Sequence, residues 1–259
     1  MIKNLNSNDF SLVLSGGGAL GIAHLGVIAD LEKAHIVPSE IVGTSMGGII
    51  GACMAIGLKE SAIYAHIKDF SSIHKWVSFS FKGNAIVGTK KIEKIFDNIF
   101  ANRKMCETHI PLKLIATHLA SGEKKVFDAN DNVTIKDALL STMAIPGIFK
   151  EHTINENIYV DGFLCENLGI NEASSDNILA VDVLGKNAYS NEMPDNFFKT
   201  ANVIEMFEKS MRLLILNQSR LHMRHSNKNI TLIEPSTRDY NTFHFHKYKE
   251  LREIGLNLV

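Results

Sequence analysis

A serine stands between two glycines in the segment Gly43-Thr44-Ser45-Met46-Gly47, which has the G-x-S-x-G spacing of a nucleophilic serine. A β-branched run at residues 40–44 comes before it and a helix-like segment at residues 46–56 follows. We therefore expect Ser45 on a sharp turn between a strand and a helix, where glycines avoid clashes with the neighbouring backbone. Such a turn would expose the Ser45 hydroxyl at the carboxyl edge of a sheet, beside a helix N-terminus that favours negative charge.

A second glycine-rich segment, Gly16-Gly17-Gly18-Ala19-Leu20-Gly21, follows the expected strand Ser11–Ser15. It satisfies the G-x-G-x-x-G fingerprint, so a dinucleotide loop is one interpretation. That fingerprint also requires a carboxylate at the end of the second strand, and residues 42–45 contain none. Three consecutive glycines can instead direct several backbone N–H groups at one point, as an oxyanion hole requires. We expect the oxyanion hole and keep the nucleotide loop as the alternative.

A serine hydroxyl needs a base that takes its proton during the attack. The chain has eleven histidines, and their surroundings in the sequence nominate none of them; His24 lies in the first expected helix, where packing or capping is the ordinary role. A carboxylate is better placed, because Asp161-Gly162 follows the strand-like residues 157–160. An Asp-Gly pair is also a common turn signal. The residues alone therefore leave a histidine base and an aspartate base both open.

Four stretches, taken together and in this order, resemble the patatin-like phospholipase family. They are LVLSGGGALGIAHLG at residues 12–26, IVGTSMGG at 41–48, STMAIPGIF at 141–149 and YVDG at 159–162. The resemblance spans residues 11 to about 185, and the ordered set is far more specific than any single motif.

The resemblance implies a Ser-Asp dyad in which Ser45 is the nucleophile and Asp161 is its direct base. It also implies an oxyanion hole formed by Gly16, Gly17 and Gly18, and cleavage of fatty acyl esters of phospholipids or acylglycerols without a metal or organic cofactor. An aspartate of ordinary pKa is a poor base for a hydroxyl, so Asp161 should be largely buried. The remaining motif glycines are expected to have structural roles: Gly21, Gly43, Gly47 and Gly162.

The chain departs from the family pattern at three places. Leu20 stands where the glycine loop usually has Arg or Lys, so one positive charge near the anion site is missing. Phe163 stands where a small residue usually follows Asp-Gly. The Asn-x-Pro continuation is Asn167-Leu168-Gly169 here. We interpret these changes as alterations of substrate fit, and a degenerate enzyme that does not turn over is the alternative.

The alternation of strand-like and helix-like segments predicts an α/β fold, specifically a three-layer α/β/α patatin-like fold with a mostly parallel central sheet. Ser121-Gly122 predicts a hairpin that adds an antiparallel strand at Lys124–Phe127. We expect one domain over residues 1–259, with a motif-bearing core at about 11–185, a loop at Gly185–Pro194 and a helical C-terminal region at about 197–259 packed on the core. The expected strands are Ser11–Ser15, Glu40–Thr44, Leu112–Leu119, Ile178–Val183 and Asn229–Ile233, and the clearest amphipathic helix is Thr89–Asn102.

Composition narrows the partners and the compartment. A net charge of −1 does not attract the phosphate backbone of nucleic acid, so we expect no nucleic-acid partner. Three cysteines without metal or redox spacing predict reduced thiols of an intracellular protein. Residues 1–10 lack the apolar region of a signal peptide. We expect a cytoplasmic protein that contacts a membrane only at its surface, and the sequence leaves its oligomeric state open.

Two segments deserve a membrane test. Residues 41–58 carry no charge, and a stretch of this length is the shortest that could form a spanning helix. A buried strand, turn and helix explain its five glycines better. The expected C-terminal helix is amphipathic. We expect its apolar side to pack on the sheet, and contact with an anionic bilayer is the alternative. On a helical wheel its basic side holds Lys209, Arg212, Arg220 and Arg224, and its apolar side holds Phe207, Met211, Leu214 and Leu221.

The function expected from these features is a serine lipid acyl hydrolase of the phospholipase A, lysophospholipase or acylglycerol esterase type. Two other functions stay open. One is an acyltransferase that uses the same dyad and hands the acyl group to an alcohol or thiol. The other is a module without catalysis that uses the glycine loop to hold a lipid headgroup or a nucleotide.

Overall fold

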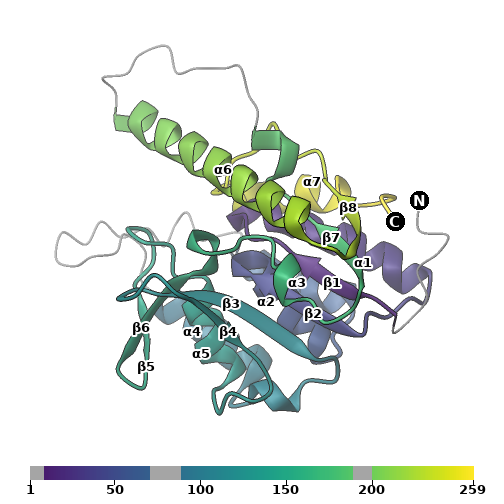
Figure 1. The fold of residues 1–259 in the computed structure, drawn as a ribbon, viewed down its shortest axis with the longest axis horizontal. Coiled ribbons are helices and arrows are strands. Elements are labelled where there is room, and N and C mark those ends of the chain that lie inside the picture. The colour runs from purple at the N-terminus through teal and green to yellow at the C-terminus, as the bar shows by residue number, and fades with distance from the viewer. Residues whose placement is uncertain (1–8, 71–88, 189–199) are drawn as a thin grey trace.

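The computed structural model describes residues 9–70, 89–188 and 200–259. Within these ranges the chain forms a mixed sheet in the order β5-β6-β3-β2-β1-β7-β8, and β4 also pairs with β3 (Figure 1). The strands are β1 Ser11–Leu14, β2 Glu40–Thr44, β3 Leu112–His118, β4 Lys124–Phe127, β5 His152–Ile154, β6 Asn157–Asp161, β7 Asn177–Val181 and β8 Asn229–Ile233.

The five strands β3, β2, β1, β7 and β8 run parallel, and β4, β5 and β6 pair in antiparallel fashion at one side of the sheet. The five parallel strands are the five expected from the sequence, and the predicted hairpin at Ser121-Gly122 joins β3 to β4. The mixed α/β class with a mostly parallel sheet is therefore confirmed. β5 is the one strand of the described sheet that was not predicted from the sequence.

Side chains alternate between the two faces of the sheet, as the pleat of a strand requires. On one face, residues such as Leu12, Leu14 and Leu179 join the large core beneath the helices α1 to α5 and α7. On the other face, five strand residues form a second cluster with Leu168, Ile170 and Ala173, and Met223 of α6 packs against it. The five are Val13, Val42, Ile115, Ile178 and Ala180. Helical layers therefore flank both faces. The helices are α1 His24–Lys33, α2 Ser45–Ala55, α3 Glu60–Phe70, α4 Lys90–Phe100, α5 Ile135–Thr142, α6 Thr200–His225 and α7 Tyr248–Glu253.

The uncharged segment at residues 41–58 is β2 followed by α2, and every residue of both elements is buried. It is therefore part of the core, as expected. Among the helices of the described ranges, none has the combination of length and apolarity that crossing a bilayer would require.

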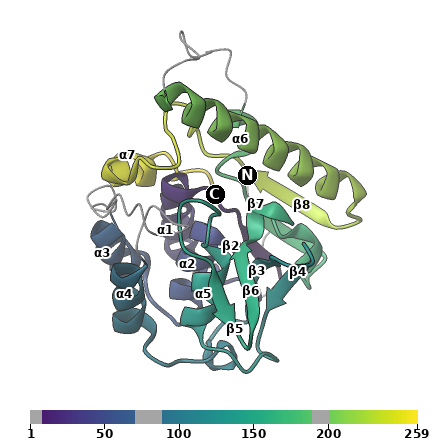
Figure 2. The same cartoon turned by 90° about the vertical axis from the view of Figure 1, so that its left-hand side faces the viewer.

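The long helix α6 lies beside β7 and β8 and contacts the 170–172 and 185–188 turns (Figure 2). The wheel prediction for its apolar side was wrong for Leu214 and Leu221, which are 63% and 53% exposed. Among the α6 side chains that the structure describes, the buried ones are Ile215, Leu216 and Ser219. Arg212, assigned to the basic side, is only 12% exposed at its side chain because it forms an ion pair with Glu208.

Parts of three predictions fall outside the described residues. The expected loop at Gly185–Pro194 is seen only as a short 3-10 helix at Gly185–Ala188. The signal-peptide prediction concerns residues 1–10, of which only residues 9 and 10 are described. The side chain of Phe207 also lies outside the described residues.

Candidate active site

The turn between β2 and α2 holds Ser45 in a left-handed backbone conformation, with φ at 52°. This conformation is uncommon for a residue other than glycine and is typical of a strained functional turn. A Cβ at Gly43 would lie 2.6 Å from Gly48 Cα, and one at Gly47 would collide with the carbonyl oxygen of Leu14. The two motif glycines are therefore required because backbone segments approach each other closely there. Ser45 itself begins α2, at the positive end of the helix dipole.

Asp161 is the last residue of β6 and is fully buried. Its backbone N–H donates to Ala144 O at 3.0 Å, and its Oδ1 accepts from the N–H of Phe163 at 3.0 Å. Because β6 is antiparallel to β3, the carboxyl end of β6 comes back towards the middle of the sheet, where Asp161 pairs with Ala116. Gly162 packs directly on the carbonyl of Ile115, which leaves no room for a Cβ.

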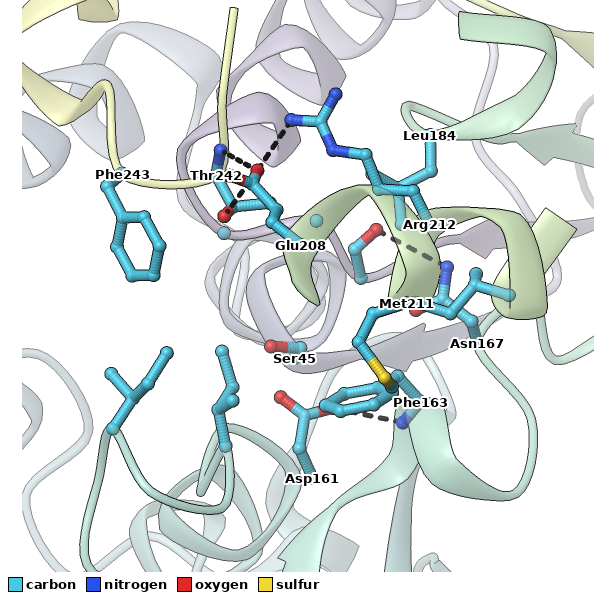
Figure 3. A pocket seen from close by; sticks show the side chains of 16 residues that line it. Ser45, Asp161, Phe163, Asn167, Leu184, Glu208, Met211, Arg212, Thr242 and Phe243 are labelled. Atoms are coloured by element: carbon cyan, nitrogen blue, oxygen red, sulfur yellow. Dashed lines mark hydrogen bonds and ion pairs between the residues drawn. The ribbon is translucent and has the colours of Figure 1, made fainter. Parts of the chain in front are cut away.

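Ser45 and Asp161 line the same cavity, and Figure 3 shows their side chains next to each other. The Oδ2 atom of Asp161 is buried without a described partner of regular hydrogen-bond geometry. Burial raises the pKa of Asp161 to about 7, and the nearby Ser45 hydroxyl and the Phe163 N–H oppose that rise. The carboxylate is thus more basic than an ordinary aspartate, as a base for a hydroxyl must be. Catalytic hydrogen bonds are commonly loose before substrate binds.

The glycine loop borders the same cavity, but its three amides are not equivalent. The N–H of Gly16 donates to Asn167 O at 3.4 Å, so it is already engaged. Neither the N–H of Gly17 nor that of Gly18 has an acceptor among the described residues. Gly18 has φ at +55° and packs against Thr242, so a side chain is excluded there. Of the three glycines expected to form an oxyanion hole, Gly17 and Gly18 are therefore the two whose N–H groups have no acceptor in the described ranges.

The histidines do not reach the site in the described ranges, since no residue lining either cavity at Ser45 is a histidine. His24 is fully buried, and its Nε2 lies 2.9 Å from the carbonyl oxygen of Ser15. Burial lowers the pKa of His24 to about 4, so it is neutral at pH 7. His24 thus has the packing role expected of it, and the geometry favours the aspartate base.

Two cavities meet at Ser45, and both include Gly18 and Ile145. The larger contains about 710 Å³ of empty space and the smaller about 310 Å³, and both volumes include space that is open to solvent. Apart from Ser45, the smaller is lined by glycine and apolar side chains, among them Met46, Phe70 and Phe149. The side chains that line the larger cavity, including Leu184, Met211 and Phe243, are drawn in Figure 3.

Three further residues at the site were not nominated from the sequence. Thr142 Oγ1 accepts a hydrogen bond from the N–H of Ser45 at 2.9 Å. Asn167 Nδ2 donates to Gly16 O at 3.4 Å and holds the glycine loop. Arg212 reaches the larger cavity from α6. Thr142 and Asn167 lie in or beside the quoted motifs, whereas nothing in the local sequence around Arg212 signals its position.

The described ranges contain no group of three or more His, Cys, Asp or Glu side chains placed to hold a metal ion. Leu20, which replaces the usual basic residue of the loop, is fully buried in the core. Its neighbour in the motif, Gly21, packs on the side chain of Met46 at the start of α2.

A sequence model described as patatin-like phospholipase matches residues 12–174, which is more than half of the chain. The chain belongs to the patatin-like phospholipase family. The matched region of this patatin-like chain contains the glycine loop, Ser45 and Asp161, whereas α6, with Arg212, lies beyond it.

Curated relatives include two proteins named lysophospholipase NTE1. The one from Debaryomyces hansenii is 22% identical and covers 99% of this patatin-like chain, and the one from Kluyveromyces lactis is 23% identical and covers 98%. An uncharacterised NTE family protein of Mycobacterium tuberculosis is 24% identical over 71% of the chain. The chain spans only 18%, 19% and 32% of the lengths of these relatives. Among solved structures, VipD from Legionella pneumophila has a TM-score of 0.46 at 14% identity, with 95% of this chain and 67% of VipD covered.

Proposed function

We propose that this patatin-like chain is a serine acyl hydrolase that cleaves fatty acyl esters of lipids with a Ser45–Asp161 dyad. The observation that carries the proposal is one cavity that Ser45, Asp161 and the glycine loop all line, with walls that are otherwise mainly apolar. The largely apolar walls of the two cavities that meet at Ser45 suit a lipid ester, and the dyad suits its carbonyl. The fungal relatives named lysophospholipase support a substrate with a single acyl chain.

The geometry supports a two-step reaction. Ser45 Oγ attacks the acyl carbonyl carbon while Asp161 takes the hydroxyl proton, and the N–H groups of Gly17 and Gly18 stabilise the negative oxygen of the tetrahedral intermediate. The intermediate collapses, and Asp161 returns the proton to the leaving alcohol. A water molecule then attacks the acyl-serine and loses its proton to Asp161. Release of the fatty acid returns that proton to Ser45 Oγ, and no metal or organic cofactor takes part.

The raised pKa of Asp161 supports its role as the base. Proton transfer is most efficient when the pKa of the base lies near the working pH, and about 7 meets that condition. The absence of a histidine among the described residues lining the cavities leaves Asp161 as the nearest candidate.

An exposed apolar surface supports contact with aggregated lipid. Leu164, Leu214 and Leu221 are 43%, 63% and 53% exposed. Gln218 of α6 donates to the carbonyl oxygens of Leu164 and Cys165, so the three leucines belong to one region where α6 meets the 164–165 turn. This exposed leucine patch adjoins Phe163 and Ile215, which line the larger cavity. The patch would bring the cavity mouth onto a lipid surface without any spanning segment.

Substitution of the dyad tests the proposal directly. We expect Ser45→Ala and Asp161→Asn each to lower the hydrolysis of a chromogenic fatty acyl ester by about 10³-fold or more, because the two side chains act as a unit. Free fatty acid and alcohol should appear in equal amounts when no other acceptor is present. Retained activity in Ser45→Ala would remove the nucleophile assignment, and retained activity only in Asp161→Asn would indicate another base.

A further inference from the structure

The two cavities at Ser45 differ in charge, so each suits a different half of an ester substrate. The larger cavity has three charged side chains among its described lining residues, Asp161, Glu208 and Arg212, and the smaller has none. Figure 3 shows the Glu208–Arg212 pair on the wall across from Asp161. An ester bound at Ser45 extends in two directions from its carbonyl carbon. The uncharged cavity suits the acyl chain, and the cavity with the ion pair suits the polar alcohol.

Arg212 is held rigidly at the wall of the larger cavity. Its Nη2 donates to Glu208 Oε1 at 2.8 Å and to Tyr240 O at 3.0 Å. Its Nε is buried and has no hydrogen-bond partner among the described residues. A buried donor without a partner is costly, and a ligand atom that reaches it would remove that cost. A fixed guanidinium with an unused donor is well suited to a phosphate oxygen.

Glu208 does not cancel this preference for an anion. Its Oε1 accepts three hydrogen bonds, from Arg212 Nη2, from Thr242 N and from Thr242 Oγ1, the last two at 2.9 Å. Those donors partly compensate the carboxylate charge and fix its direction towards the Thr242 loop. Thr242 O in turn accepts from the N–H of Ala19, which joins the ion pair to the glycine loop. Arg212 is therefore positioned relative to the same loop that is expected to bind the oxyanion.

We propose that Arg212 binds the phosphate of a lysophospholipid substrate, an inference that rests on the proposed hydrolase function. The glycine loop at residues 16–21 has no basic side chain, and Arg212 of α6 supplies a positive charge to the cavity that the loop borders. Arg212 acts as a specificity-determining residue. It distinguishes a phosphate-bearing alcohol from glycerol and takes no part in proton transfer.

The test compares two substrates with the same acyl chain, a lysophospholipid and a monoacylglycerol, in wild-type protein and in Arg212→Met. The variant keeps much of the side-chain length but removes the charge and the donors. We expect KM for the lysophospholipid to rise about 10- to 100-fold, the range of one charge-assisted hydrogen bond, while kcat/KM for the monoacylglycerol changes less than about threefold. Arg212→Lys should recover part of the loss, because it restores a charge without the planar guanidinium.

Arg224→Met is the matched control, because Arg224 is an exposed arginine about three turns further along the same helix. It should leave both substrates unaffected. Equal losses for the two substrates in Arg212→Met would overturn the proposal and show a purely structural ion pair. Unchanged KM for the lysophospholipid would overturn it as well.

A binding measurement on Ser45→Ala, which keeps Arg212, tests the phosphate contact independently of hydrolysis. It does not depend on an Arg212 variant that folds. Calorimetry should show that a short-chain lysophospholipid, below its critical micelle concentration, binds at least about tenfold more tightly than the matching monoacylglycerol. Equal affinities would overturn the role of Arg212 even if hydrolysis is confirmed. Preferential binding of the lysophospholipid by Ser45→Ala, together with a wild-type protein that hydrolyses neither substrate, would support Arg212 and reject the hydrolase.

Discussion

The side chain of Thr142 accepts a hydrogen bond from the backbone N–H of Ser45 at 2.9 Å, although 97 residues separate the two. The same hydroxyl donates to the carbonyl oxygen of Ile115 in β3. Thr142 therefore ties the end of α5 to the nucleophile turn and to the neighbouring strand. This contact gives a physical reason for the STMAIPGIF motif, which contains no residue of the dyad.

Thr142→Val should lower both stability and activity. Valine keeps the volume but leaves the buried N–H of Ser45 without its acceptor, which costs about 1–3 kcal/mol of unfolding free energy. Hydrolysis should fall about tenfold or more, because the turn that holds Ser45 loses its support. Denaturant unfolding and ester hydrolysis measure the two effects.

Thr142→Ser is the matched control for that variant, because it keeps the hydroxyl and removes only a methyl group. It should retain most of the activity, with a loss of about 1 kcal/mol in stability. Similar activity losses in the serine and valine variants would show that the hydroxyl is not what supports Ser45.

The pH dependence of hydrolysis should follow the ionisation of Asp161. The carboxylate accepts a proton only when it is ionised, and burial raises its pKa to about 7. We expect kcat/KM to fall about tenfold per pH unit below 7 and to level off above it. An unchanged rate down to pH 5 would contradict a base of that pKa.

Asp161→Asn should stabilise the protein, and more so at pH 8 than at pH 5. The folded pKa lies above the unfolded value of 3.8, so the native state binds more protons between these values and stability falls as pH rises. This penalty is absent below pH 3.8 and complete above pH 7. Removing the ionisable group should gain on the order of a few kcal/mol at pH 8, and thermal unfolding at the two pH values measures the difference. A destabilised variant at pH 8 would contradict the raised pKa.

The exposed leucine patch gives a prediction for lipid surfaces. Changing Leu214 and Leu221 together to Ser should weaken binding to phospholipid vesicles. Each leucine contributes about 1–3 kcal/mol of binding free energy when it moves from water into lipid, and serine does not. Hydrolysis of a monomeric ester should be unchanged, since neither residue lines a cavity. Vesicle co-sedimentation measures the change, and Leu119→Ser is the control, an exposed leucine at the β3–β4 hairpin. Equal binding by all three proteins would reject the patch as a lipid contact.

Local sequence patterns predicted the parallel part of the sheet well. Glu40–Thr44 and Asn229–Ile233 agree with the structure at both ends, and Ser11–Ser15 is one residue too long. The expected helix Thr89–Asn102 is observed as Lys90–Phe100, with its apolar stripe Ile92, Phe96 and Phe100 buried. These elements are determined by short-range periodicity, which a single sequence contains.

Long-range packing decided what the sequence could not predict. The buried face of α6 depends on the surface it contacts, and Ile215 and Leu216 pack inward while Leu214 faces solvent. Arg212 looked like a solvent-facing charge on the helical wheel, because its partners Glu208 and Tyr240 meet it only in the folded chain. Likewise, the engagement of the Gly16 N–H by Asn167 depends on a segment 151 residues away.

Covalent labelling of Ser45 tests the central claim most directly. A fluorophosphonate probe forms a stable bond with an activated serine and not with an ordinary hydroxyl. Mass spectrometry of the labelled protein should place the probe on Ser45, with labelling abolished in Ser45→Ala and much slower in Asp161→Asn. A probe on a different serine, or no labelling of a folded protein that still binds lipid, would contradict the account.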